Sequence, residues 1–244
     1  MMDHNIRRYV AVASLIAIAA VCAMLWCRAG APRRGSLVQR VDSAELIILR
    51  PVFSRIDLVC GTMPSSKDPT VILCVEAAFT GELSTSFAHS NIAGDHVCAG
   101  TLYQGYVCER NTGAFVFYDN RFEFVYQDYD QHIRAAALHG GCAFAQEMMI
   151  HRGILVETTR PDSNRNVFRA LCERHGRLCI IESCRSIAFG DFKAALLRAG
   201  VTEALYLDMG PGWDYAWYRP TPSNTIELHS QSHNFCTNWL TFYR

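Results

Sequence analysis

The chain has 244 residues, of which 50% are hydrophobic and 19% are charged, so it is too apolar for an intrinsically disordered protein. This length is ample for one hydrophobic core of up to about 200 residues. Lysine plus arginine and aspartate plus glutamate balance at 23 each. The balance argues against a nucleic-acid partner, because nucleic-acid binding relies on an excess of positive charge.

The first element in the chain is an apolar segment, Tyr9–Trp26, preceded by Arg7 and Arg8. At 1.5 Å per residue it reaches roughly 27 Å, close to the hydrocarbon thickness of a bilayer. We therefore predict that residues 1–27 hold a single transmembrane helix that anchors the protein. The rest of the chain would lie outside the cytoplasm, in the periplasm or at the cell surface. A cleaved export signal and a helix of a cytosolic core are the alternatives.

Arginine, glycine and proline follow, and predict a linker over residues 28–43 that leads into one domain, residues 44–244. Most of the eleven cysteines lie in this domain. An exported domain of this kind is expected to hold at least one disulfide, unless most of its cysteines are small buried hydrophobes. No Cys-x-x-Cys pair is present, and polar neighbours disfavour a helix at His229 and His233. We expect no metal and no cofactor.

Strand-like and helix-like patterns alternate through this domain. Thr70–Val75 has the composition of a buried strand, and Ala114–Tyr118 with Phe122–Tyr126 predicts a hairpin around a polar turn. Further on, a helix over 189–199 with Gly200 as its cap separates two apolar strands, which is typical of a βαβ unit. These patterns predict an α/β (α+β) fold with a central mixed β-sheet and flanking helices.

Carboxylates follow three of the predicted strands. Glu76, Glu182 and Asp208 each come directly after an apolar run, and ligands approach α/β sheets at such strand ends. Arg169 lies one strand before Glu182, and an arginine fork can bind phosphate oxygens in a bidentate manner. We expect Glu76, Arg169 and Asp208 to line one cleft. Turn formation and ion pairing inside the core are the structural alternatives.

The order of these motifs resembles the phosphodiester glycosidases, the family that includes the enzyme that uncovers mannose 6-phosphate by removing N-acetylglucosamine. The motifs that carry the resemblance are Glu76–Thr80, Gln146–Gly153, Arg169 with Gly176, and the run Gly200–Asp208. The last of these matches best, since the family has a helix, a glycine and a strand ending in aspartate.

The resemblance implies a hydrolase that acts on sugar-phosphate diesters of envelope or exopolysaccharide glycans. Paired carboxylates would stabilise an oxocarbenium-like transition state, and arginine would hold the phosphate. The implied site consists of catalytic Asp208, Glu76 and Glu182, phosphate-binding Arg169, and substrate-binding Gln146, Gly210 and Trp213.

The sequence also departs from the family pattern. Glu76 stands where the family has asparagine, and Met209 and Pro211 replace glycines that let the backbone approach a ligand closely. These departures favour a second hypothesis, a non-catalytic carbohydrate-binding or envelope interaction module built on the same fold.

Overall fold

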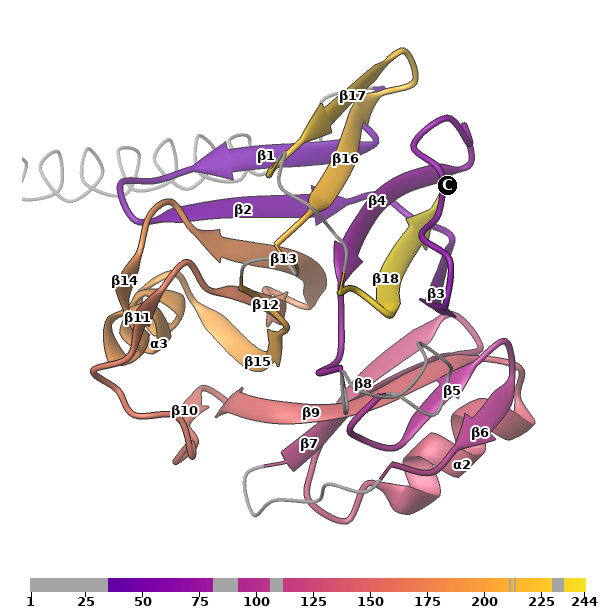
Figure 1. Cartoon of the computed structure of the whole chain (residues 1–244), viewed down its shortest axis with the longest axis horizontal. Helices are drawn as coiled ribbons and strands as arrows, with labels where there is room; N and C mark the ends of the chain where they lie inside the picture. Colours follow the sequence, from indigo (N-terminus) through magenta and orange to yellow (C-terminus); the bar gives the residue numbers. More distant parts are fainter. Residues whose placement is uncertain (1–34, 81–91, 106–111, 211, 213, 230–234) are drawn as a thin grey trace, which may run out of the picture. The chain divides into compact units, whose positions relative to one another are not determined.

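The computed structural model describes residues 35–80, 92–105, 112–210, 212, 214–229 and 235–244. They belong to a compact unit that runs from Ser36 to Arg244. This unit is mostly β-sheet, with 52% strand and 10% helix (Figure 1). The predicted α/β (α+β) class with a mixed sheet is therefore wrong, because all strand pairs of the described residues are antiparallel.

The strands and helices occur in the following order: β1 (Val38–Asp42), β2 (Leu46–Pro51), β3 (Arg55–Cys60), β4 (Val71–Glu76), β5 (His96–Cys98), β6 (Thr101–Tyr103), β7 (Thr112–Tyr118), β8 (Arg121–Tyr126), α2 (Asp130–Leu138), β9 (Cys142–His151), β10 (Ile154–Leu155), β11 (Arg165–Asn166), β12 (Arg169–Arg174), β13 (Arg177–Ser183), β14 (Ile187–Ala188), α3 (Phe189–Arg198), β15 (Val201–Leu207), β16 (Ala216–Thr221), β17 (Asn224–Glu227) and β18 (Asn238–Tyr243).

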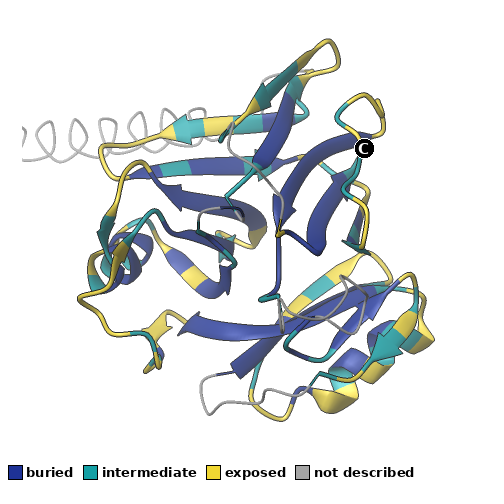
Figure 2. Ribbon diagram, in the orientation of Figure 1, coloured by how far each residue is buried: buried dark blue, intermediate teal, exposed yellow. Residues whose placement is uncertain are grey.

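Two sheets share most of these strands. The larger has the order β1-β2-β13-β12-β15-β9-β5-β6, with β10 and β7 also paired to β9, and β8 paired to β7. The smaller has the order β17-β16-β4-β18-β3. One core lies between them, because Leu205 of β15 and Val75 of β4 belong to the same buried cluster. Figure 2 shows how continuous the buried residues are along these strands.

The central strands of the larger sheet are buried on both faces. On β15, Leu205 and Leu207 point into the core shared with the smaller sheet, whereas Ala204 and Tyr206 pack with the cluster that contains α3. Side chains of a strand alternate between the two faces of a sheet. Because both faces of β15 are buried, its sequence from Ala204 to Leu207 is one continuous apolar run. The result is three layers: α3, the larger sheet and the smaller sheet.

The predicted βαβ unit exists in a modified form. Strands β13 and β15 run in the same direction and α3 connects them, but β12 lies between them and is antiparallel to both. The unit is therefore a split βαβ arrangement within an antiparallel sheet. This inserted strand is the physical reason why the prediction of a mixed sheet fails.

Local predictions are confirmed more often. The hairpin is formed by β7 and β8, and Asp119 and Asn120 at its turn have φ values of 50° and 57°. Positive φ at both positions is what a two-residue hairpin turn requires, and aspartate and asparagine tolerate it. Gly200 follows α3 with a φ of +80°, as expected of a residue that ends a helix.

The N-terminal predictions need two corrections. Val38–Asp42, assigned to a linker from composition, form β1, whose first residue is buried against the core. The fold prediction also included a transmembrane helix. In the described ranges no helix is long and apolar enough to cross a bilayer. The segment on which that prediction rests, Tyr9–Trp26, lies outside the described residues.

None of the eight cysteines in the described ranges forms a disulfide; Cys108 lies outside them. Six of the eight are buried, Cys60 is partly buried and Cys184 is exposed. The buried cysteines pack as small hydrophobic side chains, which is the alternative to a disulfide given in the sequence analysis.

Candidate functional site

Two predicted carboxylates come from different sheets and meet at one place. Glu76 ends β4, and Asp208 directly follows β15. The backbone N–H of Asp208 donates to the carbonyl of Ala77 at 3.0 Å. The backbone N–H of Thr80 donates in turn to Oδ2 of Asp208 at 3.4 Å. The segment after Glu76 is thus pinned to the end of β15.

Asn238, the first residue of β18, holds the same segment from its other side. Its Oδ1 accepts the N–H of Ala78 at 2.8 Å, and its Nδ2 donates to the carbonyl of Ala78 at 2.9 Å. Asn238 is fully buried, so both hydrogen bonds are shielded from water. This buried amide fixes the backbone between Glu76 and Phe79. A single asparagine at a strand start gives no sequence signal for that role.

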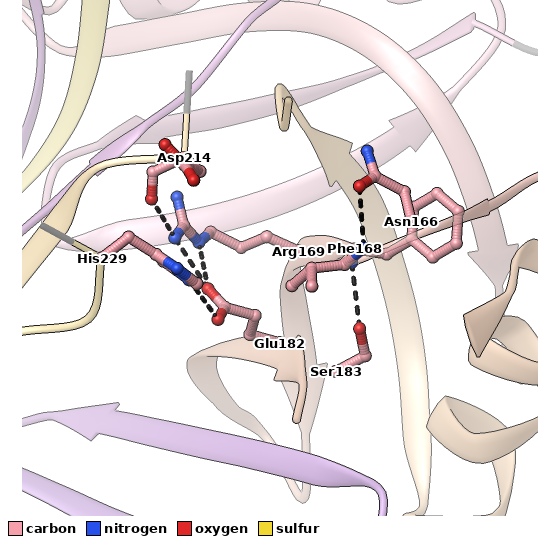
Figure 3. A network of polar contacts seen from close by, with 8 residues as sticks. Asn166, Phe168, Arg169, Glu182, Ser183, Asp214 and His229 are labelled. Carbon is pink, nitrogen blue, oxygen red and sulfur yellow. Dashed lines mark hydrogen bonds and ion pairs between the residues drawn. The ribbon is translucent and has the colours of Figure 1, made fainter. Parts of the chain in front are cut away.

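The other two predicted residues form a buried ion pair. Arg169 lies directly opposite Glu182 in the β12–β13 ladder, and its Nη2 is 2.7 Å from Oε2 of Glu182. Nε2 of His229 lies 2.6 Å from the second oxygen, Oε1, and Nη2 of Arg169 also donates to the carbonyl of Asp214 at 2.9 Å. Figure 3 shows Arg169 between Asp214 and Glu182, with His229 beside the carboxylate.

The network keeps Glu182 ionised. Burial alone would raise the pKa of Glu182, but Arg169 and His229 outweigh burial and hold the pKa below its usual range. Arg169 is 0% exposed, and its Nη1 has no hydrogen-bond partner among the described residues. Because a buried charge needs a partner of opposite charge, the main role of Arg169 here is to stabilise the carboxylate of Glu182.

The pKa of Glu76 is shifted in the opposite direction to that of Glu182. Burial raises its pKa well above the usual range; the Cys236 thiol opposes the shift, and the Asp208 carboxylate adds to it. The side chain is 0% exposed, and neither carboxyl oxygen has a hydrogen-bond partner within the described ranges that meets ordinary distance and angle limits. Burial therefore favours the neutral acid over the carboxylate at Glu76.

The pH dependence of stability tests this state of Glu76. A raised pKa in the folded protein stabilises the fold below the unfolded pKa, and this contribution is lost as pH rises through the folded pKa. From this group alone, the free energy of unfolding should fall by up to about 1.4 kcal/mol per pH unit above pH 4.5. Glu76→Gln should lack that slope. Urea denaturation from about pH 5 to about pH 9 measures it, and parallel curves for the two proteins would contradict the neutral state.

Asp208 differs from Glu76 in its surroundings. Burial raises its pKa to about 6, while the backbone N–H groups of Thr80 and Met209 and the charge of Arg160 pull it down. Asp208 is partly exposed, whereas Glu76 is not. At neutral pH Asp208, with a pKa of about 6, is mostly ionised, whereas burial favours the neutral acid at Glu76. Such a separation is common where one group acts as a base and another as an acid.

A pocket of about 330 Å³ opens on the α3 side of the larger sheet. Its polar lining comes mainly from Gln146 and Glu147 of β9 and from Arg160 and Asn164 of the following loop, and Phe79 supplies an aromatic wall. Arg160 lies 4.6 Å over the ring of Tyr206. The pocket thus combines one cation, one carboxylate and two amides beside an aromatic floor.

The alternation of β15 decides which predicted residues belong with this pocket. Tyr206 faces α3, and Asp208, two residues on, continues on the same face. Arg169 lies opposite Leu207, whose side chain points into the core on the other face. The charge of Arg160 lowers the pKa of Asp208, and the charge of Arg169 opposes the rise in the pKa of Glu76. Glu76 and Asp208 therefore come together, and Arg169 pairs with Glu182 on the face of the larger sheet that carries Leu207.

The three residues predicted to contact substrate have different outcomes. Gln146 lines the pocket. Gly210 is partly exposed two residues after Asp208, but it is not in the pocket lining. Trp213 lies outside the described residues. Arg160 and Asn164 were missed, because they lie on a loop without the periodic pattern that identifies helices and strands.

Comparisons with known proteins support the fold and go no further. No protein-family model and no curated protein matches the sequence. Among solved structures, the chain is similar to the catalytic domain of zebrafish N-acetylglucosamine-1-phosphodiester alpha-N-acetylglucosaminidase, auto-inhibited by its pro-peptide, with a TM-score of 0.59 and 10% identity over 85% of this chain and 81% of that one. A hypothetical protein from Synechocystis gives a TM-score of 0.49 and 10% identity over 85% of this chain and 61% of that one. The fold of this chain is therefore similar to that of the zebrafish catalytic domain.

Proposed function

We propose that this protein is a hydrolase of sugar-phosphate diesters in envelope or exopolysaccharide glycans outside the cytoplasm. The observation that supports the proposal is the position of Asp208, a carboxyl group with a pKa of about 6, on the same side of the sheet as the pocket that contains Arg160. A sugar-phosphate diester needs both an anion-binding group and a carboxylate near the anomeric carbon.

The chemistry follows from the two states of the carboxyl groups. Ionised Asp208 would stabilise the positive charge that develops on the sugar ring as the bond from the anomeric carbon to the phosphate oxygen breaks. The phosphate leaves as an anion and needs little protonation. Burial favours the neutral acid at Glu76, which would disfavour a second negative charge next to Asp208.

Hydrolysis of nucleotide sugars tests this proposal. In UDP-N-acetylglucosamine, cleavage at the anomeric carbon gives N-acetylglucosamine and UDP, whereas cleavage between the phosphates gives N-acetylglucosamine 1-phosphate and UMP. We expect the first pair of products from at least one sugar in a panel of glucose, galactose, mannose and N-acetylglucosamine nucleotides. The heat-unfolded protein serves as control. Absence of the first product pair for the whole panel would contradict the proposal.

One observation favours a non-catalytic carbohydrate-binding module instead. Glu76 and Arg169 are 0% exposed and Glu182 is 3% exposed, so three of the predicted active side chains have almost no solvent contact. A binding module would retain a nucleotide sugar or a glycan without producing either pair of products. Equilibrium dialysis with the same panel would detect this outcome.

A further inference from the structure

We propose that Arg160 is the anion-binding group of the pocket, and that it, rather than Arg169, contacts the phosphoryl oxygens of the substrate. This inference rests on the proposed function for the identity of the ligand. The binding chemistry can be measured without turnover.

Arg160 presents an unused donor. Its Nε is buried without a hydrogen-bond partner in the described part of the chain, and the nearest carboxylate oxygen, Oε2 of Glu147, is 3.9 Å away. That distance allows electrostatic attraction but no hydrogen bond. The guanidinium plane is held by the rings of Tyr206 at 4.6 Å and Phe189 at 5.5 Å. A guanidinium group fixed in this way is suited to bidentate binding of an oxyanion.

Arg169 is less suited to the same role. Its Nε and Nη2 are already used by Glu182 and by the carbonyl of Asp214, and its side chain is 0% exposed. The side chain of Arg160 is 24% exposed. Since Arg160 also lies on the same face as Asp208, a phosphoryl group at Arg160 would place the attached sugar within reach of that carboxylate.

Glu147 narrows the ligand class further. It lies in the same pocket with its side chain 7% exposed, so the positive charge of Arg160 is balanced by a nearby carboxylate. A simple anion would be repelled by Glu147, whereas a sugar phosphate offers hydroxyl donors for the carboxylate and oxygens for Arg160. We therefore expect a phosphorylated sugar to bind more tightly than inorganic phosphate, and both to bind through Arg160.

Isothermal titration with inorganic phosphate, glucose 1-phosphate and acetate at matched ionic strength tests the inference. Loss of a charge-assisted hydrogen bond should weaken phosphate binding about ten- to hundredfold in Arg160→Gln. Arg134→Gln removes an exposed arginine of α2 and should bind as the wild type does. Arg160→Lys keeps the charge without the fork and should bind with intermediate affinity.

Several outcomes would overturn the inference. These are no saturable phosphate binding by the wild-type protein, unchanged affinity in Arg160→Gln, and tighter binding of acetate than of phosphate. If Arg160→Gln does not fold, as judged by circular dichroism, wild-type affinity in Arg160→Lys overturns it equally. Phosphate binding that depends on Arg160, without cleavage of any nucleotide sugar, would support the anion site and contradict the hydrolase.

Discussion

Replacing Arg169 with methionine is expected to lower the free energy of unfolding by about 3–5 kcal/mol. The variant would leave the Glu182 carboxylate, whose side chain is 4% exposed, with the imidazole of His229 as its remaining side-chain partner among the described residues. An uncompensated buried charge is one of the few single changes that costs this much. Urea denaturation at pH 7 measures the loss, and a loss below about 1 kcal/mol would contradict the ion-pair account.

Two further variants separate loss of charge pairing from loss of packing. Arg219 is also buried, but its hydrogen bonds go to backbone carbonyls, including those of Val71 and Ser66. Arg219→Met therefore leaves no carboxylate unpaired and should destabilise the fold less than Arg169→Met. The double variant Arg169→Met/Glu182→Leu should regain most of the stability, because apolar replacements of a buried ion pair are often neutral or favourable.

The same pair has a defined pH dependence. A carboxyl group with a lowered folded pKa stabilises the fold above its unfolded pKa, and the contribution is lost as pH falls through the folded value. For Glu182 that loss begins below about pH 4.5, where the unfolded group becomes protonated. The difference in stability between the wild type and Arg169→Met should therefore shrink as pH falls below this value.

Local elements were predictable because their signals are local. The turn at Asp119 and Asn120 and the cap at Gly200 each depend on a few neighbouring residues. The pairing of β12 between β13 and β15 depends on contacts between residues distant in sequence. A buried strand gives the same apolar run whether its neighbours are parallel or antiparallel, so periodicity could not identify the sheet as antiparallel.

The candidate site was partly predictable for the same reason. Glu76 and Asp208 both follow buried strands, and strand ends do bring them together. The sequence could not tell on which face of the sheet Arg169 and Asp208 lie, because strand register and the exact end of each strand decide the face. No sequence pattern identifies Arg160 as a site residue. Its position depends on its packing against the ring of Tyr206.

Asp208→Asn is expected to slow turnover of a cleavable nucleotide sugar by about 10²–10⁴-fold while its binding affinity changes little. The substitution keeps the shape of the side chain and removes the charge that would stabilise the transition state. The wild-type rate should fall as pH drops through about 6, where Asp208 becomes protonated, and the variant should show no such step. Asp191→Asn, which changes an exposed aspartate of α3, should match the wild type.

Stability measurements make this last prediction specific to chemistry. Because the pKa of Asp208 is raised to about 6, the ionised group is less favourable in the folded than in the unfolded state, and its contribution to stability is lost as pH rises through that value. Asp208→Asn should therefore be at least as stable as the wild type at pH 7, although it is far less active. A rate within twofold of the wild type would contradict a catalytic role for Asp208, and a large loss of stability would mean that the residue supports the fold instead.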